Sequence, residues 1–250
     1  MKFTIETRDI LGLPIAIFDQ QGALSVLRDA LVHKKALRLA FANANLANMA
    51  FVNSDLHESL QSFVLLNDGS GMNIASKLLY RKKFPANLNG TDFVPFFLAN
   101  CDLNLRIFLL GSSPEVVKKA FMVFGENWPQ HMVVGYQHGF FTDAQAPVVF
   151  DTIKMAEPDI VLVAMGNGRQ EFWVDKLVPI ATISAWGIGA FFDFLANEVT
   201  RAPNWMRRLG IEWIYRLIQE PGRLWKRYLI GNFKFIYSVM CQFLSKLIHS

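Results

Sequence analysis

Short runs of consecutive apolar residues, each followed by a segment with helical spacing, recur along the chain. The clearest run spans residues 63–66 and stops at Asn67-Asp68-Gly69, after which Ile74, Leu78 and Leu79 share one helical face. An apolar run that ends in turn-forming residues predicts a short buried strand, and the spacing after it predicts a helix packed on that strand. Together they predict one strand-helix unit.

The same unit repeats from end to end. Ser113 and Pro114 suit the cap and the first position of a helix, and a helix opening at 89–92 has Thr91 or Asp92 as its expected cap. Strands without polar alternation are buried on both faces, as in a parallel sheet covered by helices. We therefore predict an α/β fold, a Rossmann-like mostly parallel sheet with helices on both faces. The further strands are expected at 14–18, 36–42, 105–110, 131–136, 159–165 and 180–185, and an early helix at 20–32.

Sheets of this kind bind ligands at the carboxyl ends of their strands. Asp68 ends the clearest strand and is the first candidate for chemistry, although an isolated Asp in this position is more often a turn or cap residue. The helix start at Gly111 to Glu115 offers free N–H groups to a diphosphate. The residues expected along this edge are Asn43, Asp68, Gly111, Tyr136 to Gly139 and Gly166 to Gln170.

A dinucleotide-binding site is the first alternative. Gly69-Ser-Gly71 matches two glycines of the G-x-G-x-x-G fingerprint, but Ile74 stands at the third position. The segment Gly187-Ile-Gly189 fails in the same way, and there is no Walker A sequence. These departures disfavour a nicotinamide-dependent oxidoreductase.

Charge divides the chain into two parts. Residues 1–200 have a net charge of −3 and residues 201–250 a net charge of +7, within a total of +4 over 250 residues. We expect a catalytic domain over 1–200 and a helical appendage over 201–250 directed at an anionic surface. The two cysteines and the charged residues near the start favour a cytosolic protein, and no apolar run is long enough to span a bilayer.

The basic appendage is also rich in Trp and Tyr. Pro221 is expected to interrupt its helices, and residues 233–248 form an amphipathic pattern. Basic residues interleaved with large aromatic ones suit a helix that lies in a membrane interface without crossing it. A helix that docks on a protein partner would give a similar pattern.

Several distinctive segments occur in order over nearly the whole chain: Asn43, Leu66-Asn-Asp-Gly-Ser-Gly71, Gly90-Thr-Asp92, Phe108-Leu-Leu-Gly111, Gly166-Asn-Gly-Arg-Gln-Glu-Phe-Trp173, Gly187 to Phe194 and Arg201 to Trp213 with Gln219-Glu-Pro221. Together they resemble the WecG/TagA/CpsF glycosyltransferase family. The resemblance implies transfer of a sugar from a UDP-sugar to a polyprenyl (undecaprenyl) diphosphate-linked saccharide at the cytosolic membrane face, with inversion. It implies no required metal or other cofactor, a role in surface or exopolysaccharide synthesis and no nucleic-acid partner; a homo-oligomer is possible.

The resemblance also implies roles for individual residues. Asp68 would be the general base, with Asn43 beside it and the acceptor. The expected donor-binding residues are Gly111, Gln170, Gly166 and Tyr136, and the expected lipid-diphosphate-binding residues are Arg216, Arg223 and Lys226.

Two positions depart from the family pattern. Phe41 stands where many relatives carry Thr, and Asn87 near where they carry Arg, so contacts with donor or acceptor must differ here. The sugar is not specified by the sequence. A peripheral membrane protein that senses a nucleotide without catalysis is the competing hypothesis.

Overall fold

A single eight-stranded sheet forms the centre of the computed structural model, which describes residues 5–179 and 183–248. The strand order is β1-β2-β4-β3-β8-β7-β5-β6, and only β1 and β2 pair antiparallel. This confirms the predicted α/β class with a mostly parallel sheet. The strands are β1 Thr7–Ile10, β2 Leu13–Ala16, β3 Arg38–Ala42, β4 Val64–Asn67, β5 Arg106–Gly111, β6 Met132–Gln137, β7 Ile160–Ala164 and β8 Ser184–Gly187.

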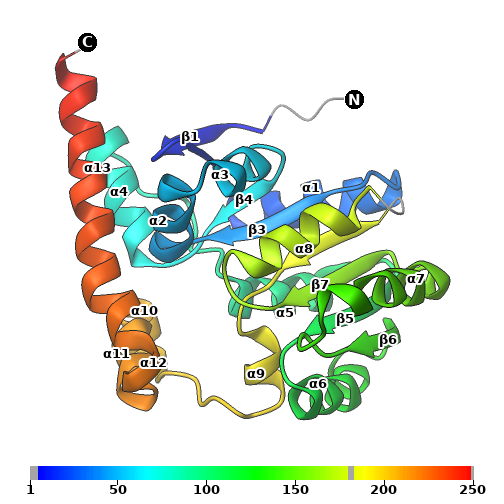
Figure 1. Cartoon of the computed structure of the whole chain (residues 1–250). Coiled ribbons are helices and arrows are strands. Elements are labelled where there is room, and N and C mark those ends of the chain that lie inside the picture. The colour runs from blue at the N-terminus through cyan, green and yellow to red at the C-terminus, as the bar shows by residue number, and fades with distance from the viewer. Residues whose placement is uncertain (1–4, 180–182, 249–250) are drawn as a thin grey trace.

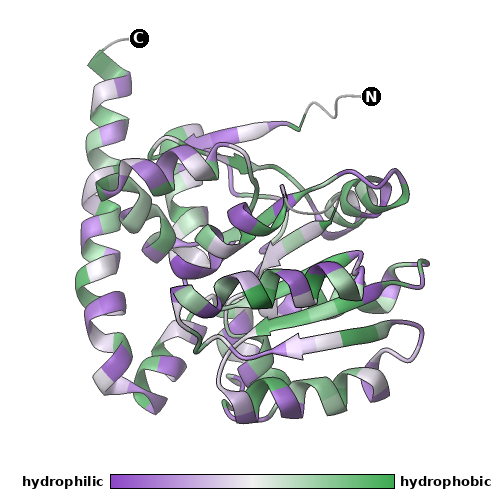
Figure 2. Cartoon of the chain, turned by 45° about the vertical axis from the view of Figure 1, so that its right-hand side comes forward, coloured by the Kyte–Doolittle hydropathy of each residue, from purple (hydrophilic) through white to green (hydrophobic). Residues whose placement is uncertain are grey.

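Helices cover both faces of the sheet (Figure 1). Alternate strand residues supply the two core layers, as Ala40 and Ala42 face one layer and Leu39 and Phe41 the other. One layer holds α2 Ala44–Val52, α3 Ser54–Leu60, α4 Ser70–Tyr80, α7 Ala146–Ala156, α8 Arg169–Leu177 and α13 Gly231–Ile248. The other holds α1 Gln20–Val32, α5 Gly90–Asn100, α6 Pro114–Asn127 and α9 Phe191–Leu195. Figure 2 shows hydrophobic residues concentrated in the strands, whereas the helices carry both hydrophobic and hydrophilic residues.

The helix boundaries test the predicted caps. Ser113 caps α6 through Val116 N, with Pro114 at the first helical position, as predicted. The predicted cap of α5 was wrong: Asn89 caps it by accepting from Asp92 N at 2.9 Å. Thr91 donates its hydroxyl to the same Asn89 oxygen, and Asp92 is engaged by arginines, so neither is available as the cap.

Two strands differ from their predicted positions. β1 was not predicted, because its Thr, Arg and Asp hide the apolar pattern of a short edge strand. The strand expected at 180–185 begins at Ser184 as β8, and residues 180–182 lie outside the described part of the chain.

The C-terminal helices lie along one side of the sheet domain. α10 Asn204–Leu209 and α11 Glu212–Gln219 are followed by a break at Glu220, and α12 Pro221–Trp225 begins at the predicted Pro221. A π-helical turn, η2 Lys226–Ile230, joins α12 to α13. α13 lies beside α2 and α4 and buries Phe235 and Val239 in the core (Figure 1). None of the described helices is long and apolar enough to cross a membrane.

Candidate active site

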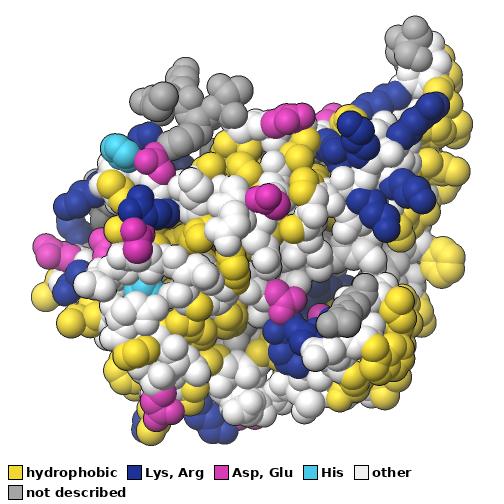
Figure 3. Space-filling view, turned by 180° about the vertical axis from the view of Figure 1, so that it is seen from behind, with side chains coloured by type: hydrophobic (Ala, Val, Ile, Leu, Met, Phe, Trp, Pro, Cys, Tyr) yellow, Lys and Arg dark blue, Asp and Glu magenta, His cyan; other side chains and the backbone are white. Residues whose placement is uncertain are grey.

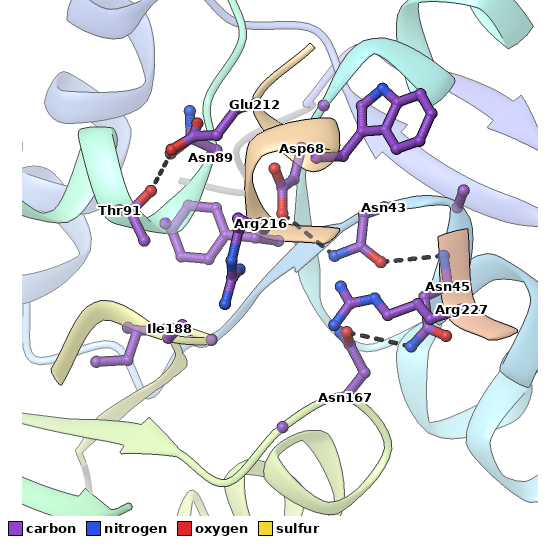
Figure 4. Close-up of a pocket in the computed structure, with 18 of the residues that line it drawn as sticks. Asn43, Asn45, Asp68, Asn89, Thr91, Asn167, Ile188, Glu212, Arg216 and Arg227 are labelled. Atoms are coloured by element: carbon purple, nitrogen blue, oxygen red, sulfur yellow. Dashed lines mark hydrogen bonds between the residues drawn. The ribbon is translucent and has the colours of Figure 1, made fainter. Parts of the chain in front are cut away.

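A cavity of about 630 Å³ opens at the carboxyl ends of the central strands. Its walls come from the loops after β3, β4, β5, β7 and β8 and from the C-terminal helices that lie over them. This is the edge where the sequence placed the candidate residues. Figure 4 shows several of them pointing into the same space.

Asn43 and Asp68 lie side by side at the centre of this cavity. Ala42 and Asn67 pair in the neighbouring strands β3 and β4, so the residue after each strand reaches the same place. Asn43 Nδ2 donates to Asp68 Oδ2 at 3.2 Å, and Asn43 Oδ1 caps α2 by accepting from Asn45 N. The cap and the contact with Asp68 therefore coexist in one side chain.

The environment of Asp68 raises the pKa of its carboxyl group. Burial is the largest cause, and the hydrogen bond from Asn43 and the charges of Arg227 and Arg216 act in the opposite direction. A carboxylate with a raised pKa is a stronger base and can accept a proton from a hydroxyl group more readily. This geometry suits a general base.

The turn after Asp68 requires glycine. Gly69 has a φ of +89° and comes directly before α4, and its N–H donates to Asn87 Oδ1 at 2.7 Å. A side chain at this φ would strain the backbone, so Gly69 allows Asp68 and the start of α4 to face the same cavity. Asn87, one of the two family departures, thus holds the turn next to the candidate base.

A chain of amides continues from Asn43 across the floor. Asn45 Nδ2 donates to Asn167 Oδ1 at 3.3 Å, and the Asn167 side chain hydrogen-bonds Glu171. Gln170 Nε2 donates to Glu171 Oε1 at 2.8 Å, and Gly189 N donates to Gln170 Oε1 at 3.1 Å. The floor therefore links four of the loops that line the cavity. Sequence reasoning found Gln170 and placed Asn167 on this edge, but it missed Asn45 and Glu171.

The predicted donor-binding residues differ in position. Gly166 and Gln170 line the cavity, whereas Gly111 does not; its neighbours Ser112 and Ser113 do. A Cβ at Gly111 would lie 2.2 Å from Ala164 O, which explains its glycine by close backbone approach. The start of α6 follows directly, with Ser112 in the left-handed region.

Tyr136 is not among the residues that line the cavity. It lies on the edge strand β6 with its ring 4.9 Å from that of Phe121, and it is partly exposed. The structure thus does not bring Tyr136 together with the other candidates.

Some basic residues of the appendage line the cavity and others do not. Arg216 and Arg223 line the cavity, and so does Arg227, which the sequence did not single out. Lys226 does not; its ammonium group lies over the Trp225 ring at 5.6 Å. Arg223 forms an ion pair with Glu220, but within the described chain Arg216 and Arg227 have no carboxylate partner in salt-bridge range. Two unpaired guanidinium groups therefore face the cavity.

Ion pairs attach the start of the appendage to the sheet domain. Asp92 on α5 lies 2.7 Å from Arg201 Nη2 and 3.3 Å from Arg207 Nη1. Arg201 also donates to Thr91 O at 3.1 Å. These contacts hold the start of the appendage over the cavity and give Asp92 a structural role.

The other family departure forms part of the floor. Phe41 is 4% exposed, lines the cavity and packs against Phe93 with ring centroids 6.3 Å apart. Its neighbour Gly90 has no room for a side chain, since a Cβ there would lie 3.1 Å from the Phe41 ring. Phe41 gives this part of the floor an apolar surface. Within the described residues, no group of three or more His, Cys, Asp or Glu side chains is placed to hold a metal ion.

Comparison with known proteins identifies the family of the chain. The model of the glycosyl transferase WecG/TagA/CpsF family matches residues 8–248. The chain belongs to this family. An N-acetylglucosaminyldiphosphoundecaprenol N-acetyl-beta-D-mannosaminyltransferase of Bacillus subtilis (strain 168) is 33% identical over 90% of this chain and 88% of its own length. A protein of the same description from Bacillus spizizenii is 34% identical over 66% of this chain and 63% of its own length.

Membership confirms the resemblance deduced from the sequence. The WecG/TagA/CpsF match covers the sheet domain and the C-terminal helices together, so both parts of the cavity wall lie within the matched residues. The protein is a glycosyltransferase, and the nicotinamide-dependent alternative is not supported.

Proposed function

We propose that this enzyme transfers a sugar from a UDP-sugar to an undecaprenyl-diphosphate-linked saccharide, with inversion at the anomeric carbon, in the synthesis of a surface polysaccharide. The observation that carries the proposal is the arrangement of Asp68, held by Asn43, opposite the two unpaired guanidinium groups of Arg216 and Arg227. A base and an anion-binding wall in one cavity match an acceptor with a hydroxyl group and a diphosphate.

Asp68 is the base in this mechanism. The acceptor hydroxyl oxygen attacks the anomeric carbon of the donor, its proton passes to the Asp68 carboxylate, and the bond to the UDP oxygen breaks with its electron pair on UDP. Asn43 Nδ2 keeps Asp68 Oδ2 in place, which leaves Asp68 Oδ1 for the hydroxyl group. General-base catalysis of this kind contributes about 10²- to 10⁴-fold in rate.

The donor and the acceptor enter from different sides of the cavity. The nucleotide diphosphate lies at the start of α6, near Ser112, Ser113 and Gly166, where free N–H groups and the helix dipole favour an anion. The acceptor diphosphate lies against Arg216, Arg223 and Arg227. Guanidinium groups bind phosphate oxygens in pairs, and their charge also offsets the charge that develops on the leaving UDP.

The outer face of the appendage is the proposed membrane contact. Large apolar side chains on α10 to α13 are exposed, and Figure 3 shows them along one edge of the molecule with Lys and Arg beside them. The side of α13 that faces the protein buries Phe235 and Val239 and makes two polar contacts, since Gln242 accepts from Leu11 N and Lys246 donates to Tyr80 Oη. An exposed apolar face flanked by basic residues suits the surface of an anionic bilayer, which would bring the lipid acceptor to Arg216 and Arg227. The exposed residues are Trp205, Leu209, Ile218, Trp225, Leu229, Ile230, Phe233, Tyr237, Met240, Leu244, Leu247 and Ile248.

The relatives suggest which substrates to test first. Both are described as N-acetylmannosaminyltransferases that act on N-acetylglucosaminyldiphosphoundecaprenol. The first donor is therefore UDP-N-acetylmannosamine, within a panel of other UDP-sugars, and the first acceptor is that lipid in vesicles. We expect UDP release that requires both substrates. UDP binding without release from any donor and acceptor pair would favour the nucleotide-sensing alternative.

A further inference from the structure

Glu171 is buried beneath the cavity, with an exposed fraction of 0%, yet it carries no cationic partner in the described chain. Its Oε2 accepts from Gly168 N at 2.5 Å, which completes the cap of α8. Its other contacts are the side-chain amides of Gln170 and Asn167. A cap alone would not need those two contacts, because one carboxylate oxygen already satisfies Gly168.

The contacts fix which way each amide faces. An amide has a donor end and an acceptor end. Both oxygens of Glu171 accept, Oε2 from Gly168 N and Oε1 from Gln170 Nε2. Gln170 therefore turns its Nε2 to Glu171 and its Oε1 to Gly189 N. Asn167 accepts from Asn45 Nδ2 through its Oδ1, so its own amide nitrogen is the group left to donate to Glu171.

Both amides line the cavity beside Gly166, on the side that the proposed donor occupies. We propose that Glu171 is a positioning residue, whose buried carboxylate orients the amides of Gln170 and Asn167 so that they bind the donor. The proposal rests on the proposed transferase function. Glu171 is not among the residues that line the cavity, whereas Gln170 and Asn167 are, so it acts by fixing the orientation of these two amides.

The Glu171→Gln variant tests this most sharply. Gln keeps the volume and one acceptor oxygen, but its –NH₂ group must meet a backbone or amide donor, so one neighbouring amide has to rotate. We expect the KM for UDP-N-acetylmannosamine and the Kd for UDP to rise about tenfold, the size expected when about one hydrogen bond to the donor is lost. The KM for N-acetylglucosaminyldiphosphoundecaprenol should stay within about twofold.

A double-mutant comparison tests whether Glu171 and Gln170 act together. If Glu171 acts through Gln170, then Glu171→Gln should add less to the donor KM in a Gln170→Ala background than it does alone. The matched control is Asn53→Ala, which removes the cap of α3 at Leu56 N on the opposite end of α2 from Asn43. This control should lower the melting temperature and leave both KM values unchanged.

Glu171→Asp keeps the test valid if Glu171→Gln does not fold. Asp suits the first turn of a helix and keeps the charge, but its shorter side chain cannot hold Gly168 and Gln170 together. It should also raise the donor KM. An unchanged donor KM and UDP Kd in a folded Glu171 variant would overturn the proposal, whatever the melting temperature does. A wild-type enzyme that turns over none of the substrates would instead count against the transferase function.

Discussion

Asn43 Nδ2 lies 3.2 Å from Asp68 Oδ2, while the same side chain caps α2 through its Oδ1. The two roles separate in two variants. Asn43→Ala removes both contacts, so we expect the free energy of unfolding to fall by about 1 kcal/mol through the lost cap, together with a fall in kcat. Asn43→Asp keeps a cap but places a second carboxylate beside Asp68.

That second variant should therefore preserve stability and impair the chemistry. A like charge raises the pKa of Asp68 further, so the acidic limb of the kcat/KM profile should move to higher pH. Thermal unfolding and a pH profile measured on the same samples distinguish the two effects. A profile in Asn43→Asp that coincides with the wild-type profile would count against the contact between these side chains.

Arg227 should tune the base, because its positive charge lowers the pKa of Asp68 against the larger effect of burial. Activity requires the ionised carboxylate and should be lost as the pH falls through that raised pKa. Arg227→Gln removes the opposing charge and should move the acidic limb of the kcat/KM profile to higher pH. Lys226→Gln is the matched control, with the same change in charge at a neighbouring side chain that does not line the cavity. Equal shifts in the two variants would remove Arg227 from the site.

Glu171 should make stability depend on pH. Burial raises the pKa of Glu171 to about 7, above the usual 4.5, so the folded state holds this proton over a range where the unfolded state has lost it. Protonated Glu171 contributes fully to the free energy of unfolding below about pH 4.5. This contribution declines by roughly 3 kcal/mol in all as the pH rises from there through about 7. Denaturant unfolding at pH 5 and pH 8 should therefore give a smaller change in Glu171→Gln than in the wild type. The same pH dependence in both proteins would contradict the assignment.

Leu244 tests the membrane face. It is 52% exposed on the outer side of α13, so Leu244→Glu leaves the core intact and places a charge where the bilayer is proposed to lie. Losing one buried Leu costs roughly 1.5–3 kcal/mol, so binding to anionic vesicles should weaken by tenfold or more. Met155→Glu on α7 is the control, since this side chain is 84% exposed on an element far from α13 (Figure 1). Cosedimentation that is equally weak for both variants would contradict the proposed face.

Point variants are preferable to removing residues from 201 onward. We expect such a truncation to abolish membrane binding and transfer. However, Phe235 and Val239 belong to the core, and their loss would uncover the parts of α2 and α4 that α13 contacts. A truncation would therefore change the fold and the membrane surface together.

Local sequence patterns predicted most of the fold. Buried parallel strands are apolar throughout, and the capping residues of each following helix are close to it in the sequence. Asn43 and Asp68 could be predicted for the same reason, because each directly follows a strand. The register of β3 and β4 brings them together. The edge strand β1 lacks the apolar run, and the cap at Asn89 depended on how Thr91 and Asp92 were used elsewhere. These details are set by tertiary contacts.

The remaining site residues depend on contacts between distant segments. Asn45 and Asn167 are 122 residues apart, and nothing local indicates that they bond. Lys226 and Arg227 are three and four residues after Arg223. Both positions lie on the same helical face as Arg223, so helical spacing does not indicate which of the two faces the cavity. The π-helical turn at 226–230 changes the direction of these side chains, and only Arg227 faces the cavity.

The most direct test of the central claim compares the wild-type enzyme with Asp68→Asn. The variant keeps the size of the side chain and cannot accept a proton at pH 7. With UDP-N-acetylmannosamine and N-acetylglucosaminyldiphosphoundecaprenol, we expect acceptor-dependent UDP release to fall by about 10²- to 10⁴-fold while the Kd for UDP is unchanged. Acceptor-dependent release at the wild-type rate in Asp68→Asn would contradict the role of Asp68 as the base.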